Sequence, residues 1–144
     1  MRRLNKTNAA LTMEFTLNSE SVARSDGSII VKESIINFGT TDDTADTLPS
    51  PAELFLGSFS SCILKNVERF SKMLKFEYQK ASIQVSAKRL EDPPRMGDIT
   101  YKLSIYSTDK NLNTHLLKKN IKKFGTIYNT VKTSCKISGN ILQV

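Results

Sequence analysis

The feature that most constrains the fold of this chain is an amphipathic stretch from Ser50 to Leu74. It begins with Ser50-Pro51-Ala52-Glu53, in which Ser can cap the first free amides, Pro suits the first helical position and Glu can reach back to the cap. Apolar residues then recur every three or four positions, which predicts a long helix with one buried face. These residues are Leu56, Phe59, Ile63, Val67, Phe70 and Leu74.

Cys62 lies in the middle of this stretch, between a run of small residues at 57–61 and the apolar pair Ile63-Leu64. A free cysteine is often only a small buried apolar residue. Two features favour a chemical role instead: Glu53 precedes the thiol on the same helix, and the small residues allow a substrate or another backbone to come close. If the helix breaks at 57–61 and restarts, Cys62 falls in a first turn, where the helix dipole favours a thiolate. If the helix is continuous, that support is lost.

Length and composition predict a single domain spanning residues 1–144, of ordinary globular composition. No apolar run approaches the ~18 residues of a membrane span, and Met1-Arg2-Arg3 is followed by polar residues, so we expect a cytoplasmic protein without membrane contact. Two cysteines in that setting argue against a structural disulfide scaffold. With two cysteines and His115 as the only histidine, we do not expect a metal site. We also expect no cofactor.

The net charge of +7 raises the possibility of a nucleic-acid or other anionic partner. The densest cluster is Lys118, Lys119, Lys122 and Lys123, on the polar side of a helix predicted over 111–124. The simpler interpretation is a solvated helix face, and a basic interaction module is the alternative. No zinc-finger spacing, aromatic RNA-binding signature or helix-turn-helix accompanies the charge, which argues against nucleic acid.

The rest of the chain predicts strands and short helices around the central helix. Alternation predicts a half-buried strand over 11–17, a turn at 18–20, a second extended piece at 21–23 and a turn at 25–27 before a strand at 29–31. The acidic segment 39–49 is expected to be a mobile loop. Strands are predicted at 83–87 and 99–105 on either side of a long break at 93–97. The helix over 111–124 should end in a left-handed cap at Gly125, followed by a short helix capped by Thr126 and a closing strand over 135–144.

A family resemblance rests on Pro51-x-Glu53-Leu54-Phe55, the small-residue run and Cys62 eleven positions after the proline. This pattern resembles the conserved helix of the OsmC/Ohr family of organic hydroperoxide reductases. The resemblance implies an α+β fold in which curved antiparallel sheets wrap long central helices in an intertwined homodimer, with a thiol site at the subunit interface. It further implies that Cys62 attacks the peroxide while Glu53 orients a cation.

Several other residues enter through the same resemblance. Arg24 and Arg95 are the candidate cations, although a solvated loop is the simpler interpretation of Arg95. An apolar interface pocket is expected to be lined by Phe55, Phe59 and Phe70.

The chain also departs from the family pattern. Where the family carries a second, resolving Cys-Pro, this sequence reads Phe124-Gly125-Thr126, and Cys135 follows ten residues later. We do not expect Cys135 to pair with Cys62, so an external thiol would be needed to reduce the oxidised sulfur. The first hairpin shows Asn18-Ser19-Glu20 in place of the family's arginine, and Ala52 replaces its glutamate.

Three functions therefore stand as hypotheses. The first is a thiol-dependent peroxidase acting on organic hydroperoxides, and the second is a non-catalytic relative that binds an apolar small molecule or senses oxidants. The third is the basic interaction module.

Overall fold

The computed structural model describes residues 3–7 and 10–144. The chain forms two compact units, residues 1–53 and 54–144, and each is described by itself. Among the described residues, no helix combines the length and the apolar character that crossing a bilayer requires.

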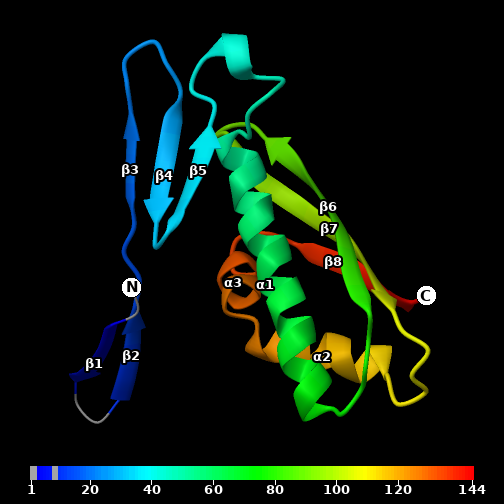
Figure 1. The fold of residues 1–144 in the computed structure, drawn as a ribbon. Helices are drawn as coiled ribbons and strands as arrows, with labels where there is room; N and C mark the ends of the chain where they lie inside the picture. The colour runs from blue at the N-terminus through cyan, green and yellow to red at the C-terminus, as the bar shows by residue number, and fades with distance from the viewer. Residues whose placement is uncertain (1–2, 8–9) are drawn as a thin grey trace. The chain divides into compact units, whose positions relative to one another are not determined.

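The first unit contains two small antiparallel sheets (Figure 1). Strand β1 (Arg3–Thr7) pairs with β2 (Ala10–Glu14), and β3 (Asn18–Ser21), β4 (Gly27–Val31) and β5 (Ser34–Phe38) form a meander. The turn before β4 and the strand at 29–31 are confirmed, but the extended piece expected at 21–23 is not, since β3 ends at Ser21. The turn expected at 18–20 is wrong, because pairing with β4 holds these polar residues in a strand despite their weak intrinsic preference for one.

The first predicted strand is shorter than expected. Strand β2 ends at Glu14 rather than Leu17, and the side chain of Leu11 lies outside the described residues. Met13, Phe15 and Leu17 are exposed in the single chain rather than half-buried.

The acidic segment after β5 has local structure and hydrogen bonds within the first unit, while its mobility stays a prediction. It contains a short 3-10 helix, η1 (Asp42–Thr44). The Thr44 hydroxyl donates to Asp26 Oδ1 at 2.6 Å, and the Gly39 amide donates to the Pro49 carbonyl at 3.0 Å. The turn before β4 thus anchors this segment through one carboxylate.

The second unit is built on a three-stranded sheet with the order β6-β7-β8. Strand β6 (Lys80–Leu90) runs antiparallel to β7 (Arg95–Tyr106), and β8 (Ile137–Gln143) runs parallel to β7. The expectation of purely antiparallel sheets is therefore wrong, because α2 (Thr114–Phe124) and α3 (Thr126–Val131) form a crossover that returns the chain in the same direction. The long break expected at 93–97 is also wrong, since β7 begins at Arg95, which already pairs with Leu90.

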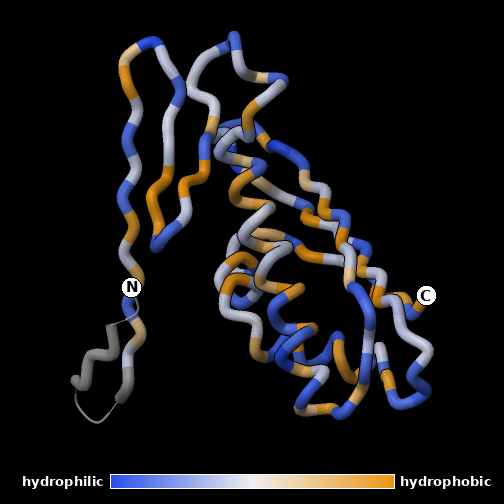
Figure 2. The backbone as a smooth tube through the Cα atoms, in the orientation of Figure 1, coloured by the Kyte–Doolittle hydropathy of each residue, from blue (hydrophilic) through white to orange (hydrophobic). Residues whose placement is uncertain are grey.

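The central helix α1 (Pro51–Met73) places its apolar stripe in the core, as predicted (Figures 1 and 2). Phe59, Ile63, Val67 and Phe70 are fully buried or nearly so. From the sheet side, alternate residues of β7 enter the same core, as the period of two predicts. They are Ile99, Tyr101, Leu103 and Ile105.

The junction between α2 and α3 differs from the predicted cap. Gly125 has φ −69° and ψ 113°, so it is extended rather than left-handed, and Thr126 is the first residue of α3 rather than its cap. Crowding explains the glycine. A Cβ atom at this position would lie 2.8 Å from the Ile121 carbonyl oxygen and 3.0 Å from Tyr128 Cβ.

Candidate functional site

The start of α1 is a capping box, as the sequence predicts. The Ser50 amide donates to Glu53 Oε1 at 3.1 Å, and the Glu53 amide donates to Ser50 Oγ at 3.2 Å. The backbone N–H of Ser50, assisted by its hydroxyl, holds the pKa of Glu53 below its ordinary value. The exposed Glu53 carboxylate is therefore ionised at neutral pH and engaged in capping the helix.

The helix continues without a break through Gly57 and the serines that follow. Cys62 therefore lies about three turns inside α1, beyond the first turn where the dipole stabilises an anion. The interrupted-helix alternative is wrong. Nine residues of continuous helix also span about 13 Å along the axis, so the capping carboxylate and the thiol occupy different turns.

Among the described residues, the thiol has one polar partner, the side chain of Asn66. Asn66 Nδ2 donates to Cys62 Sγ at 3.6 Å and to the Cys62 carbonyl oxygen at 2.8 Å. Asn66 is buried, whereas Cys62 is half-buried. The hydroxyls of Ser60 and Ser61 instead bond to carbonyls of their own helix. An amide held on the sulfur can stabilise negative charge there.

Sequence reasoning missed Asn66. The available signal was a polar residue directly before Val67 of the apolar stripe and four positions after the thiol, where a helix brings two side chains together. Gly125 lies beside the same amide, since a Cβ atom on it would be 3.6 Å from Asn66 Nδ2. The α2–α3 junction, where the family pattern predicts a second cysteine, thus adjoins the partner of Cys62 but carries no sulfur.

Cys135 occupies a different environment. It is buried, and its thiol donates to the Met96 carbonyl oxygen at 3.4 Å. Both cysteines are free. Cys135 is therefore a thiol held against strand β7.

The two candidate arginines have other surroundings. Arg24 is exposed in the turn before β4, with φ 62°. Arg95 is exposed and donates to the carbonyl oxygens of Glu91 and Pro93 at 2.8 and 3.0 Å, which fits the solvated-turn interpretation. In the part of the chain that the structure describes, no lysine or arginine forms a hydrogen bond with the thiol. A cationic role for either arginine stays a prediction.

Two of the three phenylalanines expected in a pocket are core residues. Phe59 is fully buried, with its ring centroid 6.1 Å from Tyr101 and 5.8 Å from Tyr128. Phe70 packs against Phe124 with 5.9 Å between centroids. Phe55 is half-buried. The interface pocket stays a prediction, and within one chain Phe55 is the member that reaches solvent.

The lysine cluster on α2 is only partly a solvated face. Lys119, Lys122 and Lys123 are exposed, but Lys118 is half-buried and its ammonium donates to the Gly139 carbonyl oxygen at 2.6 Å. The solvated interpretation is therefore wrong for Lys118. Its position on the helix side that faces β8 lets it reach across to that strand.

The chain is similar to proteins of one known family. A family model described as OsmC-like protein matches residues 42–139. No curated protein matches the sequence. Among solved structures, an OsmC-like protein from Mycoplasma pneumoniae has a TM-score of 0.81 at 15% identity, covering 91% of this chain and 97% of its own.

Two further solved structures carry functional names. The organic hydroperoxide resistance protein OsmC from Legionella pneumophila has a TM-score of 0.65 at 12% identity, covering 88% of this chain and 96% of its own. The organic hydroperoxide resistance protein OhrB of Bacillus subtilis has a TM-score of 0.63 at 17% identity, covering 89% and 98%. At these identities the likeness concerns the fold, and the family model covers most of the chain. The protein belongs to the family of OsmC-like proteins.

Proposed function

We propose that this protein reduces organic hydroperoxides with Cys62 as its only catalytic sulfur and an external thiol as reductant. The observation that carries the proposal is a half-buried thiol on the central helix with the Asn66 amide on its sulfur at 3.6 Å. Structural neighbours named organic hydroperoxide resistance proteins support the same class of substrate. The peroxide resistance is a property of those proteins and comes to this chain as part of the proposal.

The proposed reaction has two halves. The Cys62 thiolate attacks one peroxide oxygen, the O–O bond breaks, and the alkoxide takes a proton to leave as an alcohol while the sulfur becomes a sulfenic acid. An external thiol then forms a mixed disulfide with Cys62 and releases water. A second external thiol regenerates Cys62 and leaves as half of a small disulfide. One hydroperoxide and two thiols thus give one alcohol, one water and one disulfide.

An external reductant is needed because no second thiol is placed to form a disulfide with Cys62. Two positions were candidates: the α2–α3 junction, where the family pattern has a cysteine, and Cys135. Gly125 adjoins Asn66 but has no side chain. Cys135 is buried with its thiol on the Met96 carbonyl. Neither offers Cys62 an accessible thiolate, which disulfide formation requires.

We further propose that the working form is a homodimer in the cytoplasm. The single chain exposes apolar side chains in its first unit, notably Phe15, Val22 and Ile35, each more than two-thirds exposed. A second copy of the chain would remove these side chains from water. It could also bring a cation to Cys62, with Arg24 as the first candidate.

Turnover of cumene hydroperoxide with dithiothreitol tests the proposal. Cys62→Ser should abolish turnover, and Cys135→Ser should leave it nearly intact. One equivalent of peroxide without reductant should add one oxygen atom to the intact mass, and dimedone should trap it on Cys62. Loss of two hydrogen atoms instead, with a Cys62–Cys135 peptide, would refute the external-reductant mechanism. Oxidation without turnover would favour an oxidant sensor.

A further inference from the structure

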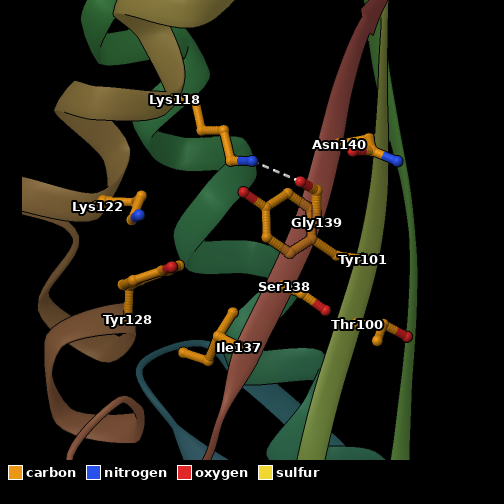
Figure 3. Close-up of a pocket in the computed structure, with 9 residues that line it drawn as sticks. All are labelled: Thr100, Tyr101, Lys118, Lys122, Tyr128, Ile137, Ser138, Gly139 and Asn140. Atoms are coloured by element: carbon orange, nitrogen blue, oxygen red, sulfur yellow. Dashed lines mark hydrogen bonds between the residues drawn. The ribbon is translucent and has the colours of Figure 1, made fainter.

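A cavity lies in the second unit, between α2, α3 and the strands β7 and β8 (Figure 3). The cavity has a volume of ≈ 470 Å³. Side chains that carry its chemistry are Tyr101, Tyr128, Lys118 and Lys122. Cys62 does not line it, so the mechanism proposed above makes no use of it.

The Tyr101 hydroxyl is the unusual group at this cavity. Tyr101 is 5% exposed, and its hydroxyl oxygen has no hydrogen-bond partner among the residues that the structure describes. An unpartnered buried hydroxyl is unfavourable, because it has given up its bonds to water without replacement. Burial, with a smaller contribution from Tyr128, raises the pKa of Tyr101 to about 12. The hydroxyl is therefore a proton donor throughout the neutral range.

Lys118 and Tyr101 approach the same residue of β8, Gly139. In the sheet, Tyr101 pairs with Gly139, and a Cβ atom on that glycine would be 2.2 Å from the tyrosine ring. The Lys118 ammonium bonds to the carbonyl oxygen of the same glycine. This single bond uses one of three ammonium protons. Figure 3 draws both residues together with Gly139 and marks the bond between Lys118 and that glycine.

The charged side chains that line the cavity are all basic. Lys122 follows Lys118 by one helical turn and faces the same space from α2 (Figure 3). Among the described residues, no aspartate or glutamate lines the cavity. Two ammonium groups and a buried phenol proton therefore converge without a nearby carboxylate to neutralise them. Such a group of donors suits an oxyanion.

We propose that this cavity binds a small organic anion, with its carboxylate or phosphate group on Lys118, Lys122 and the Tyr101 hydroxyl. The volume falls within the ~300–1,000 Å³ that small-molecule sites occupy, which leaves room for an organic part against the Tyr128 ring. Solvent does not reach the Tyr101 oxygen in the free protein. An anion that bonds to this oxygen must therefore displace a group that covers it. The flexible Lys118 side chain, which leaves the Gly139 carbonyl to bind the anion, is the group that we propose to move.

The test is a titration of the full chain followed by two-dimensional NMR, with four probes. Phenyl phosphate and benzoate share a ring and differ in the anionic group, benzyl alcohol is the uncharged analogue, and inorganic phosphate lacks the ring. We expect at least one of the two aromatic anions to shift resonances of Gly139 and Lys118 saturably. Benzyl alcohol should bind at least about tenfold more weakly, and inorganic phosphate should fall between.

Three variants assign the donors. Tyr101→Phe removes one oxygen and should weaken anion binding at least about threefold, while thermal unfolding of the free protein stays unchanged or shifts upward. Lys118→Gln should weaken it about tenfold and reduce its salt dependence. Lys119→Gln, an exposed neighbour outside the cavity, is the control and should have no effect.

The proposal is overturned by any of three results. These are no saturable binding of either aromatic anion, equal binding of benzyl alcohol, and equal loss of binding in Lys118→Gln and Lys119→Gln. Unchanged anion affinity in Tyr101→Phe would overturn the proposed hydrogen bond from the Tyr101 hydroxyl to the anion. Cys62→Ser should bind the anion like wild type. A failure of the anion-site proposal would therefore leave the proposed peroxidase activity untouched.

Discussion

Replacing Asn66 by alanine tests whether the amide on the sulfur matters for chemistry. In the structure Asn66 Nδ2 donates to two acceptors, Cys62 Sγ at 3.6 Å and the Cys62 carbonyl oxygen at 2.8 Å. The sulfur contact is long, so its contribution to a thiolate should fall below the roughly 1.5–3 kcal/mol of a well-formed hydrogen bond to a charged group, at about 0.7–1.4 kcal/mol. That energy corresponds to a rate about threefold to tenfold lower for the attack of Cys62 on a peroxide.

Asn120 offers a matched control on α2. Its Nδ2 donates to the Leu116 carbonyl at 2.9 Å, the same bond to the residue four positions earlier but without a sulfur. Asn66→Ala should cost about 1–3 kcal/mol of unfolding free energy, because it removes a buried side chain and its hydrogen bonds. Asn120→Ala should stay within about 0.5 kcal/mol, because the better helix propensity of alanine offsets the lost bond.

The assay uses a Cys135→Ser background so that only one thiol reacts. Rates with cumene hydroperoxide and with iodoacetamide are measured under conditions where urea titration shows both variants folded. Slower reaction of Cys62 in Asn66→Ala than in Asn120→Ala would support Asn66 as a positioning residue for the thiolate. Equal rates in Asn66→Ala and Asn120→Ala, with Asn66→Ala fully folded, would refute the reasoning.

Three other predictions follow from the geometry. Gly125→Ala should lower the unfolding free energy by about 1–3 kcal/mol in urea titration, because its methyl group meets the Ile121 carbonyl at 2.8 Å; a neutral result would mean that the junction relaxes freely. Tyr101 and Tyr78 have pKa values raised to about 12, and burial also raises the pKa of Tyr128, so ultraviolet titration should show three of the four tyrosines ionising late, two of them near pH 12. The contribution of Tyr101 and Tyr78 to stability is present below the unfolded pKa near 10 and is lost as the pH rises through about 12, and Tyr101→Phe should remove one late step. The pKa of Glu53 is lowered, so its contribution is present above the unfolded pKa and lost as the pH falls through the folded one; Glu53→Gln should therefore be less stable than wild type at pH 7 and equal to it in strong acid.

Local patterns predicted the central helix well. The capping box at Ser50 and the apolar stripe through Phe59 and Phe70 depend on residues three or four positions apart, which a helix brings together whatever surrounds it. The alternation that buries Ile99 and Leu103 is equally local. Cys62 could be singled out because its place in that helix matches a family pattern.

Other features required contacts between residues far apart in sequence. The parallel pairing of β8 with β7 depends on the crossover through α2 and α3, and the strand at 18–21 forms because β4 pairs with it. Propensity alone favours a turn there, and pairing outweighs it. Gly125 could not be read correctly either, since the sequence shows a glycine but not the Ile121 carbonyl that crowds it.

The sequence by itself determined that a capped, amphipathic helix would carry one thiol in its middle, because helical periodicity and capping are properties of neighbouring residues. Only the tertiary structure decided what surrounds that thiol and which side chains line the cavity between α2, α3 and β8. Asn66 is set beside Gly125 by the packing of α3. Tyr101 and Lys118 meet at Gly139 because strands and helices far apart in the chain pack together, and a buried hydroxyl without a partner is visible only once those neighbours are in place.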